Sequence, residues 1–574
     1  MGAKQKKIGN RKVDAGASTG APERASINRF WTILDRYQAA ILVALLILGS
    51  ARIVLTYNIF NHTADEPAHI ACGMEWLDKK VYQWEAQHPP LARIASAIGP
   101  FLLGIRSQGT KTGYPESMSV EGTAILYKNN RYDRNLAAAR LGILPFFWIA
   151  CLVVYSWGKR YFDSRIALLA VFFFSFLPTL LAHSSLATTD AALTAFLGLA
   201  FLRGAIWAEG PTWKNGLWLG GAGGLAVLSK FSSLLFFPAS AALALGYWGV
   251  VWGRKLSWLS EIRKRIPSLA LATVVAVLVV WAAYRFSFGP VNGIPFPVPA
   301  PEFFKGIQEV QVHNTVGHMG YLLGQNRDTG WWYFFEVALL VKSPLAFLLL
   351  LGVGCFMTLT HEGRFRNAWL PLCFSAAILI VSAFGQINIG LRHVLPVYVG
   401  FSILAALALD WLLRRPARWT LSVAGVLVVW FAASSLLAHP DYLAYFNEFG
   451  GTHPENILVD SDLDWGQDIK RLSRRLRELG AKEVAFTSLV IADYEHQHGF
   501  PHVNIMKVDQ PLPGWNAAGL TNFKQRFGMY YQRPDMELWI DSVPPKEKVG
   551  KSILLWYFDY PQTPAATPPA GGSR

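Results

Sequence analysis

QAAILVALLILGSARIVLTY, residues 38–57, is an apolar run with a single charged residue, Arg52, and the acidic stretch ADEPAH follows it at residues 64–69. An α-helix rises about 1.5 Å per residue, so roughly 20 apolar residues are enough to cross the hydrocarbon core of a bilayer. The run therefore predicts a membrane-spanning helix. It also places the carboxylates of Asp65 and Glu66 at a membrane surface, where they need pairing, hydration or a chemical role.

The composition of the whole chain extends this interpretation. Of 574 residues, 52% are apolar and only 16% are charged, with 22 Trp and 36 Phe. This excludes a disordered chain or an ordinary soluble protein and indicates a polytopic α-helical membrane protein. We predict about eleven transmembrane helices, at residues 38–57, 136–157, 166–182, 191–208, 216–229, 232–252, 268–288, 334–359, 370–388, 394–413 and 420–437.

The distribution of Lys and Arg predicts the orientation, because short loops rich in these residues stay on the cytoplasmic side. Basic residues gather before the first span and in alternate loops, whereas the loop HSSLATTD at residues 183–190 has none. We therefore expect residues 1–37 to be a disordered, basic, cytoplasmic tail, and residues 438–574 to be extracytoplasmic. The net charge of +15 reflects this bias and attraction to an anionic lipid bilayer, so no nucleic-acid partner is inferred.

Three segments are too long to be simple connections. Residues 58–135 and 289–333 are predicted as long external loops, and residues 438–574 as a small α/β domain with a Pro-rich C-terminal tail. In that domain, residues 456–460 and 483–489 are predicted strands on either side of an amphipathic helix that ends at Gly480, which makes a βαβ unit.

Two features inside the predicted spans have structural interpretations. Gly216, Gly220 and Gly224 recur at four-residue spacing, which is typical of closely packed helices. Lys342 lies within the eighth span, where it is expected to pair with Glu336 or to line a polar cavity.

Several short motifs, taken in order, resemble a known family. They are ADEPAH (64–69), HPPLAR (88–93), SSLATTDAAL (184–193), SKF (229–231), NIGLRHVLP (388–396), HPDYLAYFNEFGG (439–451) and DSDLDWGQD (460–468). Together they look like the GT-C glycosyltransferases of the family 39 type, which are similar to protein O-mannosyltransferases and bacterial lipid-sugar transferases. The resemblance implies a GT-C fold in a bacterial inner membrane and transfer of a sugar from a polyprenyl phosphate donor to an extracytoplasmic lipid, glycan or protein acceptor.

The residues suit such a reaction on chemical grounds. A base must take the proton of the acceptor hydroxyl, and cations must hold the leaving phosphate. By the family match Asp65 is the candidate base and Asp190 a substrate-binding residue. Glu66 is a second catalytic candidate, although it could instead orient a loop. Further substrate-binding candidates are His88, Arg93, Lys230, Arg392 and His393.

Alternatives remain open at this point. Asp65 or Glu66 could cap the following helix, and Asp190 precedes an apolar helix as a capping residue would. Hydrogen bonds at caps and strand ends explain the acids of DSDLDWGQD, with acceptor binding as the alternative. The segment fails as an EF-hand because Trp465 and Arg471 occupy the required glycine and glutamate positions. No metal ligands are assigned, while a divalent cation could bridge Asp65 and Asp190.

Other functional classes also fit the composition. A transporter or flippase for lipid-linked sugars would place its polar groups near the midplane, whereas the acids marked here cluster on one face. An assembly scaffold would tolerate loss of Asp65. The segment GWWYF (330–334) lacks the WWDYG signature of oligosaccharyltransferases, so transfer of a whole glycan to asparagine is not expected.

Overall fold

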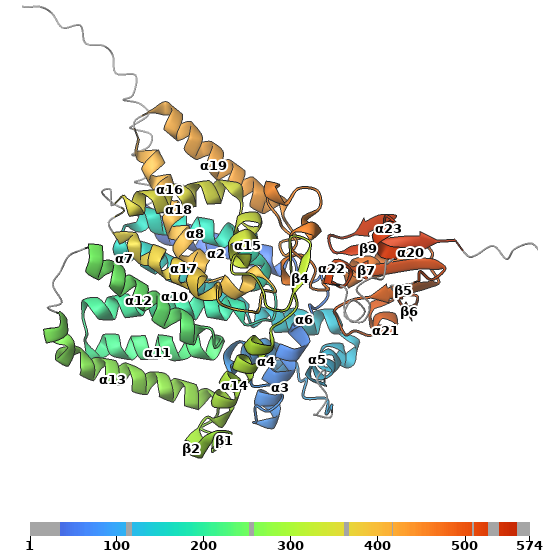
Figure 1. Cartoon of the computed structure of the whole chain (residues 1–574), viewed down its shortest axis with the longest axis horizontal. Coiled ribbons are helices and arrows are strands. Elements are labelled where there is room, and N and C mark those ends of the chain that lie inside the picture. The colour runs from blue at the N-terminus through green and yellow to red at the C-terminus, as the bar shows by residue number, and fades with distance from the viewer. Residues whose placement is uncertain are drawn as a thin grey trace, which may run out of the picture.

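A computed structural model describes residues 35–110, 117–251, 258–360, 365, 367–415, 417–507, 510–525 and 539–559. Most of the predicted basic tail at residues 1–37 and the Pro-rich C-terminal tail lie outside the described residues. The described chain forms a large helical body with a smaller sheet-containing domain on one side of it (Figure 1).

Every predicted apolar span corresponds to one or two helices of the body. They are α2 (Gln38–Val54), α6 (Tyr132–Leu141), α7 (Leu144–Tyr161), α8 (Ser164–Phe176), α9 (Pro178–Ser184), α10 (Asp190–Glu209), α11 (Trp213–Ser229), α12 (Ser233–Val251), α13 (Trp258–Ala283), α15 (Phe334–Lys342), α16 (Leu345–Leu359), α17 (Trp369–Ser382), α18 (Val397–Arg414) and α19 (Arg418–Leu437). The chain is thus a helical, integral membrane protein, as the sequence predicted.

Among the described residues, six helices are long and apolar enough to cross a membrane, or seven when the bent pair α8–α9 is counted as one span. Two predicted spans are broken at proline. Pro178 begins α9, which is bent by 67° from α8, and Pro344 separates α15 from α16. Proline has no N–H to continue the helical hydrogen bonds, so a helix readily ends or bends there.

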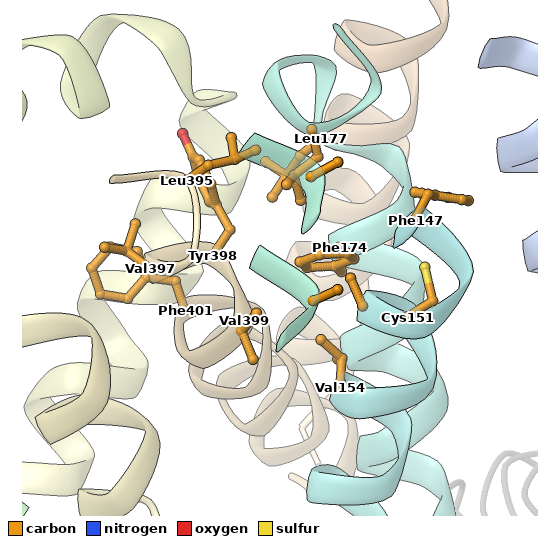
Figure 2. Packing of buried hydrophobic residues seen from close by; sticks show 14 of the residues in the cluster. Phe147, Cys151, Val154, Phe174, Leu177, Leu395, Val397, Tyr398, Val399 and Phe401 are labelled. Carbon is orange, nitrogen blue, oxygen red and sulfur yellow. The ribbon is translucent and has the colours of Figure 1, made fainter. Parts of the chain in front are cut away.

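The centre of the body is an aromatic and aliphatic core. Figure 2 shows buried side chains of this core, among them Phe147, Cys151 and Val154 of α7, Phe174 of α8 and Val399 of α18. All five side chains are buried, and α18 has nearly all of its residues inside the protein. A helix that is apolar on every side is stable only when it is surrounded by other helices or lipid. The burial of α18 shows that it lies inside the body, surrounded by other helices.

The glycine repeat of α11 packs against α13. A Cβ atom added at Gly216 would lie 2.4 Å from the carbonyl oxygen of Ser268, and one at Gly220 would lie 2.3 Å from that of Ala272. Both distances are shorter than van der Waals contact. The predicted close packing of these helices is therefore confirmed.

Valine in place of Gly220 is expected to destabilise the protein by about 1–3 kcal/mol or more, because the added atoms would overlap the backbone of α13. Thermal unfolding of the protein in detergent measures the effect. Gly221→Val is the matched control, since a Cβ at Gly221 meets nothing within 4 Å. Equal stability of the two variants would contradict the packing argument.

The two long segments between the body helices are mostly structured. Residues 58–135 form α3 (Glu66–Met74), the π-helical turn η1 (Glu75–Lys79), α4 (Pro90–Leu102), α5 (Ser117–Tyr127) and the 3-10 turn η2 (Lys128–Asn130) before α6. Residues 289–333 include the hairpin β1–β2 (Phe288–Val291 and Ile294–Pro299), α14 (Pro301–Val316) and the hairpin β3–β4 (Gly320–Leu322 and Gln325–Arg327).

The C-terminal domain is built on a five-stranded sheet with the order β6-β5-β7-β9-β8. Strand β5 is parallel to β6 and β7, whereas β9 is antiparallel to β7 and β8. The elements are η5 (Glu448–Gly450), η6 (Pro454–Asn456), η7 (Asp460–Asp462), α20 (Ile469–Glu478), β5 (Glu483–Thr487), α21 (Tyr494–His498), β6 (His502–Ile505), β7 (Gly514–Gly519), α22 (Leu520–Gln525), α23 (Trp539–Ser542), β8 (Glu547–Val549) and β9 (Ile553–Phe558).

The α/β character predicted for this domain is correct, as are its first helix and the strand after Gly480. The predicted strand at residues 456–460 is wrong, because this stretch joins two 3-10 turns. Two of its apolar residues are buried where the helical body meets the C-terminal domain. Leu458 belongs to the core of the body and Val459 to the core of the domain.

Lys342 of α15 connects the body to the C-terminal segment through hydrogen bonds. Its Nζ donates to the carbonyl oxygen of Leu443 at 2.8 Å and to that of Asp462. The expected pairing with Glu336 is therefore wrong, because the end of α15 faces the incoming chain rather than its own preceding turn.

Candidate active site

Asp65 begins the site. It is the residue before α3, yet its side chain makes no hydrogen bond to the helix end, so the capping alternative is wrong for this residue. Its Oδ2 instead accepts a hydrogen bond from Nη1 of Arg392 at 3.0 Å, and 36% of the side chain is exposed. Asp65 is thus paired with a cation and still accessible.

Asp190 lies beside the same cation. Its Oδ1 accepts from Nζ of Lys230 at 2.8 Å, and its Oδ2 lies 3.9 Å from Nη1 of Arg392. The cap position of α10 is Thr189, and the Asp190 side chain is fully buried. Burying a carboxylate without a partner is costly, so the two cations account for its presence.

Four helix ends bring these side chains together. Asp65 immediately precedes α3, Asp190 starts α10, Lys230 immediately follows α11, and Arg392 lies in the 3-10 turn η4 (Leu391–Val394) just before α18. Three of these ends, those of α3, α10 and α18, are helix N-termini, which carry partial positive charge. The site therefore has two carboxylates, two cations and three helix N-termini at one end of the body.

Histidines surround this cluster. Burial, followed by the nearby charge of Lys230, lowers the pKa of His88 to about 4, and burial also holds the pKa of His393 well below its usual value. Both rings are therefore neutral near pH 7. Within the described part of the chain, Nε2 of His393 and Nε2 of His69 are buried without a hydrogen-bond partner. Buried polar atoms of this kind suit a polar ligand.

Arg93 is buried and bonded to several neighbouring side chains. It forms an ion pair with Glu85 and donates to the hydroxyl of Tyr82 at 2.9 Å and to Nδ1 of His69 at 3.0 Å. Its exposed fraction is 1%. In this arrangement Arg93 holds the loop that carries His88, and a direct contact of Arg93 with substrate stays a prediction.

Glu66 joins three segments of the chain. It is fully buried and accepts from Nε and Nη2 of Arg140, both at 2.8 Å, and from the main-chain N–H groups of Thr63 and Ala187, also at 2.8 Å. Ala187 belongs to the loop that leads to Asp190. Of the two roles considered for Glu66, this geometry favours orientation of a loop over direct catalysis.

The DSDLDWGQD segment reaches the site through Ser461 and Trp465, two residues that the sequence analysis did not single out for it. Ser461 Oγ accepts from Nε of Arg392 at 3.1 Å, and the Trp465 ring centroid lies 4.2 Å from Cζ of the same guanidinium, close enough for a cation–π contact. The family resemblance includes both of the motifs at residues 388–396 and 460–468. Their spacing along the chain does not predict that the two motifs contact each other in the fold.

Among the residues that the structure describes, no group of three or more His, Cys, Asp or Glu side chains is arranged to hold a metal ion. The positive charge between Asp65 and Asp190 comes from Arg392, at the place where a bridging divalent cation was considered.

Residues 132–284 match the model of the family described as dolichyl-phosphate-mannose-protein mannosyltransferase. This segment contains Asp190 and Lys230, and it covers less than half of the chain. The match confirms the resemblance predicted from the sequence for that segment. No curated protein sequence matches the chain.

Solved structures with a similar course of the chain include three transferases. ArnT from Cupriavidus metallidurans bound to undecaprenyl phosphate has 13% identity and a TM-score of 0.49, covering 89% of this chain and 97% of that chain. The protein O-mannosyltransferase complex of S. cerevisiae bound to the sugar donor has 11% identity and a TM-score of 0.49, covering 70% and 88%. The oligosaccharyltransferase of Archaeoglobus fulgidus tethered with an acceptor peptide has 13% identity and a TM-score of 0.48, covering 78% and 58%. With TM-scores below 0.5, the functional assignment depends on the site and on the matched segment.

Proposed function

We propose that this chain is a membrane glycosyltransferase that moves a sugar from a polyprenyl phosphate donor to a hydroxyl acceptor on the extracytoplasmic side of a bacterial inner membrane. The observation that carries the proposal is the contact of one guanidinium, that of Arg392, with both Asp65 and Asp190. A second support is the family match, which includes Asp190 and Lys230.

The proposed reaction uses the two carboxylates differently. The acceptor hydroxyl oxygen attacks the anomeric carbon, the bond from that carbon to the phosphate oxygen breaks, and the phosphate leaves with the bonding electrons. Asp65, which is accessible, takes the hydroxyl proton. Asp190 is buried and holds Lys230 and Arg392 in place, so that their charges stabilise the leaving phosphate.

The neighbouring imidazoles fit the same reaction. His88 and His393 are neutral at pH 7, so each ring can donate one hydrogen bond and accept another. Sugar hydroxyls have both capacities. The N-termini of α10 and α18 favour an anion at the same end of the body.

Purified protein is expected to transfer label from at least one member of a panel of radiolabelled polyprenyl phosphate sugars to acceptors in a membrane extract. Product is measured by scintillation counting after separation of unused donor. Absence of product with every donor would contradict the proposal, and movement of the lipid-linked sugar across proteoliposome membranes under the same conditions would identify a flippase instead.

A further inference from the structure

Three of the four acids in DSDLDWGQD have structural partners. Asp462 accepts from the N–H of Leu391 at 3.1 Å, Asp464 from the N–H of Thr521 at 2.8 Å, and Asp468 from the hydroxyl of Ser552 at 2.9 Å. All three are buried. They fix the segment to η4, α22 and the loop before β9, as the prediction of structural hydrogen bonds for these acids implies.

Asp460 differs from the other three. It is half-buried, and its φ of +57° is in the left-handed region, which costs free energy for any residue other than glycine and is tolerated best by Asn and Asp. One carboxylate oxygen accepts from the N–H of Ser461 at 2.6 Å. The other has no donor within the described ranges of the chain.

The position of Asp460 connects it to the cluster described above. The next residue, Ser461, contacts Nε of Arg392, and Asp65 contacts Nη1 of the same guanidinium. Arg392 and Asp65 both interact electrostatically with the Asp460 carboxylate. Asp460 and Asp65 thus interact with the same cation, one from the C-terminal segment and the other from the start of α3.

We propose that Asp460 is a further carboxylate of the active site and that it binds a second hydroxyl group of the acceptor, next to the hydroxyl that Asp65 deprotonates. This inference depends on the proposed function. The donor phosphate is anionic and would be repelled by a carboxylate, so Asp460 belongs to the acceptor side of the site. An acceptor held through two hydroxyls is a glycan or another polyol rather than a single serine or threonine side chain.

The protonation of Asp460 gives the inference a pH signature. Burial raises the pKa of Asp460 to about 7, Arg392 opposes the rise, and Asp65 and Asp462 add to it. These are the charged groups that face Asp460 from α3, from η4 and from its own turn. Above pH 7 the ionised carboxylate accepts hydroxyl hydrogen bonds more strongly, so the acceptor KM should fall as pH rises from 6 to 8.

Asp460→Asn tests the inference with little change of shape, because Asn tolerates a positive φ and its carbonyl can still accept from Ser461. The acceptor KM is expected to rise at least about tenfold, with the donor KM unchanged, and the dependence of acceptor KM on pH between 6 and 8 should disappear. Thermal unfolding checks the fold. Asp460→Gly, which removes the backbone strain, replaces the Asn variant if that variant fails to fold.

Glu478→Gln is the control, because the Glu478 side chain is 53% exposed on α20 and pairs with Arg475 on the surface. An unchanged acceptor KM for Asp460→Asn, or equal kcat/KM for a serine peptide and a glycan acceptor, would overturn the role of Asp460 while transfer by the wild-type protein still supports the proposed function. Failure of the wild-type protein to transfer any sugar would overturn the proposed function itself.

Discussion

Asn in place of Asp65 is expected to lower kcat for sugar transfer by about 10²–10⁴-fold, the usual contribution of a positioned general base. The carboxamide has nearly the same size as the carboxylate, and its oxygen can still accept the hydrogen bond that Arg392 donates at 3.0 Å. It cannot, however, take a proton from the acceptor hydroxyl. The loss should therefore fall on kcat, with little change in the KM of the donor.

The measurement is the initial rate of transfer at saturating donor, compared with Asp133→Asn. Asp133 lies in the same long segment, its side chain is 59% exposed, and it pairs with Lys470 away from the cluster. The control variant should retain the wild-type kcat. Undiminished kcat for Asp65→Asn would remove Asp65 from the chemical step and would favour a scaffold, which tolerates this substitution.

Much of the helical body could be predicted from the sequence, because long apolar windows have few alternatives to helix in a membrane. The sequence did not predict that the spans at residues 166–182 and 334–359 are interrupted at Pro178 and Pro344. A proline within an apolar window is compatible with a kink as well as with an end, and packing against neighbouring helices decides between them.

The candidate site could be predicted in part. Helix ends at one membrane face placed Asp65, Asp190, Lys230 and Arg392 in the same region, and the structure brings all four into contact through Arg392 and Lys230. Pairing partners within that region depend on side-chain directions that sequence does not encode locally. For this reason the sequence leaves both a catalytic and a loop-orienting role open for Glu66, and its contact with Arg140 favours the second.

The structure of residues 456–460 could not be predicted from the sequence. Residues 457–459 are Ile-Leu-Val, which is typical of a strand, but the structure uses them to fill the seam between the helical body and the C-terminal domain. The N–H of Leu323 donates to the carbonyl oxygen of Ile457, so this backbone is partly paired outside any sheet. Contacts between residues far apart in the chain outweigh local β-propensity here.

Gln in place of Glu66 is expected to lower the free energy of unfolding by about 3–5 kcal/mol, because the charge of Arg140 would remain buried without its partner. The exposed fractions of the two side chains are 0% and 1%. Arg140 also donates to the carbonyl oxygen of Asn61 at 2.8 Å, so the substitution should loosen the start of α3 and the loop before Asp190 together. Denaturant unfolding in detergent measures the change.

The double variant Glu66→Gln/Arg140→Gln separates lost pairing from general damage, since it removes both charges. It should be less destabilised than the sum of the two single variants, and additive effects would contradict a coupled pair.

Burial raises the pKa of Glu66, but Arg140 and the N–H donors more than offset this and hold the pKa below its ordinary value of 4.5. The stabilisation from Glu66 is therefore fully present above pH 4.5 and is lost as pH falls through the lowered folded pKa, whereas the Gln variant should lack this acid-sensitive component.

Folded Glu66→Gln should keep kcat within about tenfold of wild type, and a loss as large as that expected for a general base would instead place Glu66 in the chemical step.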